Sequence, residues 1–293
     1  MSGGLPGPGR AIVQGSGKDL VILVHGFSDS ADSWHRVQPL LARERTVVAI
    51  DLPGFGRSAE AWPLPLLDAY RDLILAVARE HGRGGTTTIV GNSLGGVAAA
   101  HAAAHAPDLI DRIVLADVPG LAPAPLLWAR ASSARAEAIL RALTGRLPAP
   151  AAVTVFELLF SAAARHRKRL DAAARRAVRA NYPQPATVVA LLPKARDVLR
   201  AIDELDLPGL IANLPMPVHL VWGEHDWLTP PRTGRRLLAH PHVTGAVLPG
   251  CGHCPQHDRP RAFAALLEEV LGTPPGTHDT RSADGSERNE IAQ

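Results

Sequence analysis

The chain has 293 residues, of which 46% are hydrophobic and 20% charged, and its formal net charge is +3. This composition is that of an ordinary globular protein with a sizeable core and one or two domains. No uninterrupted apolar run reaches the roughly 18 residues of a membrane span, and two cysteines give no disulfide framework. We therefore expect no stable membrane insertion.

The first residues, 1–17, are rich in glycine and proline and lack the apolar stretch of a secretory signal. They predict a flexible N-terminus and a cytoplasmic location.

Strand-like and helix-like segments then alternate. The run Leu20-Val21-Ile22-Leu23-Val24 is continuously apolar, as in a strand buried on both faces. The predicted strands are 20–24, 46–51, 87–90, 112–117, 217–223 and 243–248. The predicted helices are 34–41, 66–80, 94–105, 231–239 and 261–271. This alternation implies right-handed βαβ units and a mostly parallel central sheet flanked by helices, an α/β fold.

The alternation stops after residue 120. Residues 121–207 are rich in alanine and arginine, have helical character and contain no convincing strand, so they predict an inserted helical cap. The α/β core then consists of residues 18–120 and 208–272. Residues 273–293 are polar and are predicted to be disordered.

The cap is basic. Residues 121–200 contain fourteen Lys or Arg against four Asp or Glu, a balance of +10 that leaves −7 for the rest of the chain. We favour a solvated, arginine-rich helical surface, with an anion-binding lid as the alternative. No stacking aromatics interleave the arginines, so we expect no nucleic-acid partner.

The segment Val90-Gly91-Asn92-Ser93-Leu94-Gly95-Gly96 lies between a predicted strand and a predicted helix. A serine on such a sharp turn projects its hydroxyl from the carboxyl edge of the sheet, and glycines are needed where the helix packs tightly against the strand. Ser93 is therefore the candidate nucleophile. A glycine-rich turn without a catalytic role is the alternative, and the flanking strand and helix argue against it.

Two further residues follow the last predicted strands: Asp226 in Trp222-Gly223-Glu224-His225-Asp226, and His253 in Gly250-Cys251-Gly252-His253. The order Ser, Asp, His, with an upstream His25-Gly26 turn and the segment 51–58, resembles the α/β-hydrolase fold family. The resemblance covers about residues 20–271 and implies a cap-bearing serine hydrolase.

A serine hydroxyl becomes a good nucleophile when an imidazole accepts its proton, the role expected of His253. Asp226 would fix the imidazole tautomer, and the backbone N–H groups of Phe27 and Leu94 would hold the oxyanion. An alternative remains open, in which Asp226 only caps a helix and Asp117 is the catalytic carboxylate; we prefer Asp226.

By resemblance, His25 lies in the oxyanion turn and is structural, and Asp51 stabilises a turn. Neither of two metal-like arrangements is expected to hold a metal. His101 and His105 lack the glutamate of a zinc-binding helix, and a metal at Cys251, Cys254 and His257 would sequester the base. We therefore expect no metal, no disulfide and no cofactor.

We call the turn Gly91-Asn92-Ser93-Leu94-Gly95-Gly96 the elbow. A serine at its nucleophile position excludes relatives that use aspartate there. Hydrolysis of a carboxylic ester or related acyl substrate is therefore the first hypothesis. The elbow also resembles that of carbon–carbon bond hydrolases of ring-cleavage products, but Phe27 and Cys254 depart from their pattern. Cofactor-free perhydrolases or haloperoxidases share the triad, and a member that binds ligands without turnover is the least favoured alternative. Substrate identity, acyl chain length and oligomeric state are not fixed by the sequence.

Overall fold

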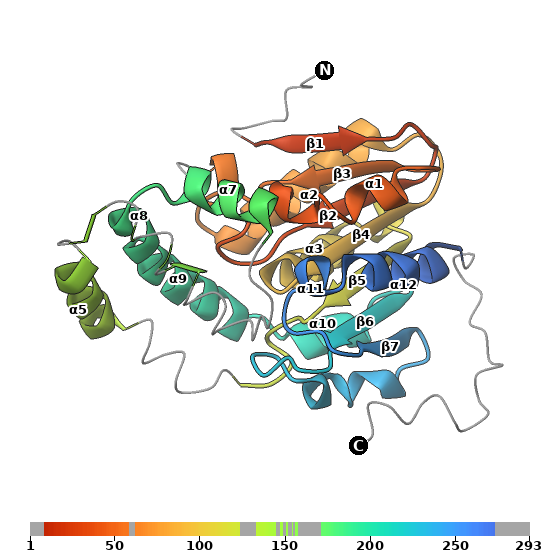
Figure 1. Ribbon diagram of the computed structural model, residues 1–293. Helices are drawn as coiled ribbons and strands as arrows, with labels where there is room; N and C mark the ends of the chain where they lie inside the picture. Colours follow the sequence, from red (N-terminus) through yellow and green to blue (C-terminus); the bar gives the residue numbers. More distant parts are fainter. Residues whose placement is uncertain are drawn as a thin grey trace.

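The structure, a computed structural model, describes residues 9–58, 62–123, 133–144, 147–148, 151, 154, 156–157 and 171–272 (Figure 1). The predicted disordered tail, 273–293, lies outside the described residues. Within the described part of the chain, no helix is both long enough and apolar enough to cross a bilayer.

A seven-stranded sheet forms the centre of the molecule, in the order β1-β3-β2-β4-β5-β6-β7. Every neighbouring pair is parallel except β1 and β3, so the predicted mostly parallel α/β sheet is confirmed. The strands are β1 (Ala11–Gln14), β2 (Leu20–Val24), β3 (Thr46–Ile50), β4 (Thr87–Asn92), β5 (Arg112–Ala116), β6 (Val218–Gly223) and β7 (Val243–Leu248).

Helices cover both faces of this sheet (Figure 1). On β2, Leu20, Ile22 and Val24 pack with the helices of one face, whereas Val21 and Leu23 pack with those of the other. A strand buried on both faces has no room for polar side chains, which explains its uninterrupted apolar run. One face carries α2 (Leu66–His81), α3 (Leu94–His105) and α10 (Leu207–Ala212); the other carries α1 (Gln38–Leu41), α11 (Pro255–Asp258) and α12 (Pro260–Gly272).

Three predicted elements differ from the structure. Residues 11–14, within the segment predicted to be flexible, form the edge strand β1. It pairs with β3 and so satisfies backbone groups of β3 that would otherwise lie at the edge of the sheet. The predicted helix 34–41 is a 3₁₀ turn (Ala31–Trp34) followed by the single turn of α1. The predicted helix 231–239 consists of two 3₁₀ turns, Pro231–Gly234 and Leu237–Ala239.

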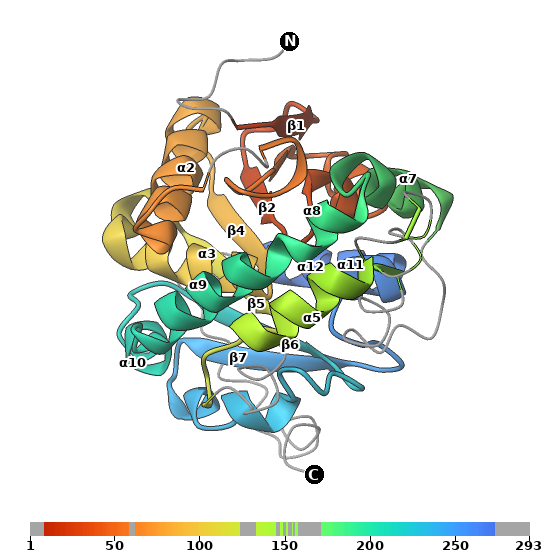
Figure 2. The ribbon, with the colours of Figure 1, turned by 90° about the vertical axis from the view of Figure 1, so that its left-hand side faces the viewer.

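The described parts of residues 121–207 are helical and contain no strand. They include α5 (Ala134–Thr144), α7 (Ala172–Asn181), α8 (Pro185–Val189) and α9 (Leu191–Asp203). Figure 2 shows α5, α8 and α9 lying across one end of the sheet. Because residues of α8 and α9 line the same cavity as Ser93 at the end of β4, this is the end where the parallel strands terminate.

Polar contacts join these helices to the core around β2 and β3. The Tyr182 hydroxyl donates to the carbonyl of Ser28 (2.9 Å), and Lys194 Nζ donates to the carbonyl of Gly54 (2.6 Å). Trp62 Nε1 donates to Asp197 (3.0 Å). The helical segment is therefore attached to the core beside the turn that follows β2 and the segment that follows β3.

Candidate active site

Ser93 lies on a sharp turn between β4 and α3. Its φ of 53° and ψ of −120° are a strained backbone conformation for a residue with a side chain. The Ser93 N–H donates to the carbonyl of Ala116 on β5 (2.8 Å), which holds the turn against the neighbouring strand. The partly buried serine therefore sits at the carboxyl edge of the sheet, as its flanking strand and helix predict.

The glycines around Ser93 are required by close backbone contacts. A Cβ at Gly91 would lie 2.3 Å from the carbonyl oxygen of Gly95, and a Cβ at Gly95 would lie 2.3 Å from the carbonyl oxygen of Val24. No side chain fits at either position without moving α3 away from the sheet. The strand-to-helix packing inferred from the sequence is thus the physical reason for both glycines.

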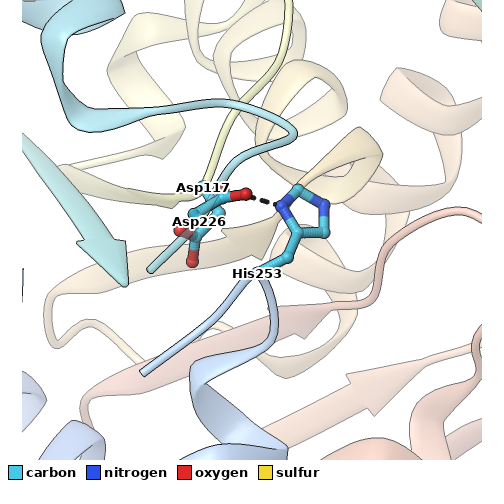
Figure 3. A group of neighbouring side chains, drawn as sticks. All are labelled: Asp117, Asp226 and His253. Atoms are coloured by element: carbon cyan, nitrogen blue, oxygen red, sulfur yellow. Dashed lines mark hydrogen bonds and ion pairs between the residues drawn. The ribbon is translucent and has the colours of Figure 1, made fainter. Parts of the chain in front are cut away.

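His253 and Asp226 come together at the ends of β7 and β6. The His253 ring lies with Nδ1 2.9 Å from Asp226 Oδ2 (Figure 3). Asp226 also accepts the N–H groups of Leu228 (2.8 Å) and Thr229 (3.2 Å) and the Thr229 hydroxyl. Since the ionised carboxylate is acceptor-only, the proton of this contact sits on Nδ1, and Nε2 is the nitrogen left to accept a proton.

The electrostatics of this carboxylate favour its ionised form. Burial alone raises the pKa of the Asp226 carboxyl, but the charge and hydrogen bond of His253 and the hydroxyl of Thr229 together lower it to about 2. Asp226 therefore carries its negative charge across the whole neutral range.

Asn92, which precedes the serine, links the elbow to the histidine loop. Its Nδ2 donates to the carbonyl of His253 (3.0 Å) and to that of Ala116 (3.3 Å), and its Oδ1 accepts from Gln256 (3.0 Å). All of these side-chain atoms belong to buried residues. Sequence reasoning gave Asn92, Gln256 and Thr229 no role; only the Asp226-to-Thr229 spacing, typical of a side-chain-to-backbone turn, could have pointed to one of them.

The two backbone N–H groups expected to hold an oxyanion lie in the turn after β2 and at the start of α3. Among the described residues, no oxygen accepts the N–H of Phe27 or that of Leu94, and both residues line the cavity that contains Ser93. Unpartnered N–H groups at such a turn are suited to an oxyanion.

His25 and Asp51 have the structural roles inferred for them. The Leu52 N–H donates to His25 Nε2 (2.9 Å), so the ring proton is on Nδ1, which donates to the carbonyl of Gly26 (2.7 Å). Asp51 accepts the N–H groups of Ala31 (2.7 Å) and Arg57 (2.8 Å). Through these hydrogen bonds, both side chains stabilise the turns beside Phe27.

A partly buried ion pair connects the same turn to α11. Asp29 Oδ2 lies 3.3 Å from His257 Nε2. Burial raises the pKa of Asp29 and lowers that of His257, but their mutual hydrogen bond and charge outweigh it, so the Asp29 pKa ends lowered and the His257 pKa raised. This contact joins the turn that carries Phe27 to the segment that carries His253.

Ser93 and His253 open into a cavity of about 560 Å³ between the sheet edge and the helical segment. Its wall is mainly apolar and includes Leu94, Val118, Leu121, Val188, Leu191, Val198 and Ile202. Arg232 and Asp203, both exposed, also line it. The cavity volume and lining are those of a site for a largely apolar small molecule.

Among the described residues, the cluster of candidate metal ligands is Asp117, Asp226 and His253. Cys251 and Cys254 are buried free thiols, and His101 contacts Asp68 (3.0 Å). Within the described part of residues 121–207, Glu137 accepts from Arg141 and Arg196 (both 2.8 Å). Residues 158–170, with more of the basic side chains, lie outside the described residues.

We expect activity to survive both a strong chelator and a reducing agent. The carboxylate that a metal at this cluster would need already binds the His253 ring, and the two thiols are buried and unlinked. Turnover measured after dialysis against a chelator, and separately after reduction, tests this. Loss of turnover that added zinc restores would contradict it.

Comparison with known proteins gives consistent matches. The model of the alpha/beta hydrolase fold family matches residues 19–260. The pimeloyl-[acyl-carrier protein] methyl ester esterase of Pectobacterium atrosepticum is 28% identical over 270 residues, which cover 88% of this chain and 95% of that protein.

Solved structures share the fold at lower identity. The 2-hydroxy-6-oxo-6-phenylhexa-2,4-dienoate hydrolase of Rhodococcus sp. strain RHA1 matches with a TM-score of 0.69 and 23% identity, covering 90% of this chain and 95% of that one. A bromoperoxidase from Bacillus anthracis matches with a TM-score of 0.67 and 19% identity, covering 90% and 95%.

Proposed function

The chain belongs to the alpha/beta hydrolase fold family, and on that premise we propose that it is a serine hydrolase that cleaves a carboxylic ester through an acyl-enzyme intermediate. The observation that carries the proposal is the strained Ser93 in the same apolar cavity as His253, whose ring is hydrogen-bonded to the ionised Asp226.

In this mechanism the Ser93 hydroxyl attacks the ester carbonyl while His253 Nε2 accepts its proton. The contact from Nδ1 to Asp226 holds the tautomer with Nε2 unprotonated and stabilises the imidazolium that forms. The imidazolium then gives its proton to the departing alcohol. Water, activated by the same ring, hydrolyses the acyl-serine and restores the free hydroxyl.

The N–H groups of Phe27 and Leu94 stabilise the oxyanion of both tetrahedral intermediates. They come from separate elements, the turn after β2 and the start of α3. One such donor contributes roughly 3 kcal/mol to lowering the barrier in a serine hydrolase. The contacts of His25 and Asp29 matter to catalysis because they hold the turn that presents the Phe27 N–H.

The substrate we propose is a small ester with a largely apolar acyl or aryl part, which the wall of the cavity would bury. The similarity to an esterase of pimeloyl-carrier methyl esters supports ester chemistry. We place the protein in the cytoplasm as part of the same proposal.

A carbon–carbon bond hydrolase is the second candidate, because the elbow Gly91-Asn92-Ser93-Leu94-Gly95-Gly96 resembles that group. We expect kcat/KM to be larger for short or medium acyl aryl esters than for a vinylogous dioxo acid, since the triad and oxyanion hole act on any ester carbonyl. Both substrates are measured on one preparation. A large preference for the dioxo acid would replace the esterase proposal with the second candidate.

A fluorophosphonate probe supplies the independent test of the nucleophile. Mass spectrometry of the labelled protein should locate the adduct on Ser93. A protein that neither labels nor turns over any ester would favour ligand binding without catalysis.

A further inference from the structure

Asp117, which follows β5 directly, has no part in the mechanism described above. Its side chain is fully buried and its φ is +50°, a strained value for aspartate. Oδ1 accepts the N–H of Gly223 (2.9 Å). Among the described residues, Oδ2 has no donor within reach. A buried carboxylate oxygen without a donor is costly unless the group is neutral.

The surroundings of Asp117 oppose a second negative charge. One polar atom each of Asp117, Asp226 and His253 lies within 4.8 Å of the others (Figure 3). One carboxyl oxygen of Asp117 and one of Asp226 are thus at most 4.8 Å apart in the protein interior. Two carboxylates that share a buried site do not both ionise near neutral pH, so one of them holds a proton.

The hydrogen bonds decide which carboxyl holds it. Asp226 accepts four donors, from Leu228, His253 and two groups of Thr229, whereas Asp117 accepts one. Donors stabilise the ionised form, which assigns the charge to Asp226.

The wider surroundings agree with this assignment. Burial, and next the charge of Asp226, raise the pKa of Asp117 well above its usual value. Besides Asp226 and His253, the titratable groups near Asp117 are Asp258 on α11 and the thiols of Cys251 and Cys254, none of which is a cation.

We propose that Asp117 is a neutral carboxylic acid whose hydroxyl donates to Asp226, which makes it a positioning residue for the carboxylate that orients His253. Oδ1 is the acceptor for Gly223, and the protonated Oδ2 is the donor. Asp117 thereby joins the backbone of β6 to the triad carboxylate and leaves a single negative charge facing the imidazole. Its effect on turnover rests on the proposed hydrolase function, whereas its protonation does not.

The first test is the infrared spectrum of the whole protein at neutral pH. The wild type should show the carbonyl stretch of a protonated carboxylic acid, shifted in D₂O, and Asp117→Asn should lack it. Asp226→Asn should also weaken the band, because Asp117 ionises more readily without the neighbouring charge. Asp111→Asn, at the other end of β5, is the matched control and should keep the band. A band that persists in Asp117→Asn, or is absent from the wild type, would overturn the proposal.

The second test is the pH dependence of kcat/KM for an aryl ester. Asparagine keeps both a donor and an acceptor and, like the proposed neutral acid, carries no charge. Asp117→Asn should therefore leave the apparent pKa of the acidic limb of the profile within about 0.3 unit of the wild-type value. Asp117→Leu removes the donor and should lower kcat by about tenfold with little change in KM, a loss that asparagine rescues. A fall of the acidic limb by about one unit or more in Asp117→Asn would mean that a negative charge was removed, against the proposal. If no ester is hydrolysed, the proposed function fails, and the infrared spectrum still decides the protonation of Asp117.

Discussion

Ser93→Ala should lower kcat for aryl esters by on the order of 10⁵- to 10⁶-fold, the size of effect seen when a triad serine is removed from a protease. The loss corresponds to about 7 to 8 kcal/mol of barrier. It follows from the mechanism: without the hydroxyl no acyl-enzyme forms, and only the oxyanion hole and binding contacts remain to act on a water molecule.

The fold of this variant should be preserved, because the contacts that shape the turn are made by backbone. The Ser93 N–H donates to Ala116, and its carbonyl accepts from Gly96 (2.8 Å). Among the described residues, the Ser93 hydroxyl makes no hydrogen bond that would be lost in alanine. Circular dichroism and the urea midpoint should therefore match those of the wild type, and the fluorophosphonate adduct should disappear. Turnover at the wild-type rate would show that the nucleophile is another residue.

The elbow was predictable because its requirement is local. A serine forced to positive φ between a buried strand and a helix needs glycines within two residues on either side, and those four or five positions can be recognised without tertiary information. The buried strands were predictable for a similar reason, since a strand covered on both faces must be continuously apolar.

Elements that depend on distant partners were not predictable in this way. Strand β1 has only four residues, is half-exposed and follows a glycine- and proline-rich start, so nothing local marks it; β3 supplies its pairing. Asn92 donates to the carbonyl of His253, 161 residues along the chain. Asp117 and Asp226 follow different strands, and the sequence left them as alternatives because it could not show that they share one buried site.

Asp226→Asn should lower kcat by about 10⁴-fold, the loss known for this change in a serine-protease triad. An amide at this position can present its NH₂ to the ring, so that Nδ1 becomes the acceptor and the proton moves to Nε2. The ring then has no lone pair directed at the Ser93 hydroxyl, and the imidazolium has no counter-charge. KM should change little, because Asp226 is buried and does not line the cavity.

The matched variant for this experiment is Asp117→Asn, which carries the same chemical change on the neighbouring carboxyl. If Asp226 is the acid of the triad, the loss of kcat should be severe in Asp226→Asn and mild in Asp117→Asn, because only Asp226 is hydrogen-bonded to the ring. The double variant should be less active than Asp226→Asn, because Asp117 ionises more readily without the neighbouring charge and partly replaces Asp226 in the single variant. The further loss of rate in the double variant would measure the coupling between the two carboxyl groups. The reverse result, a severe loss of kcat in Asp117→Asn and a mild one in Asp226→Asn, would make Asp117, at the end of β5, the acid and overturn the triad proposed here.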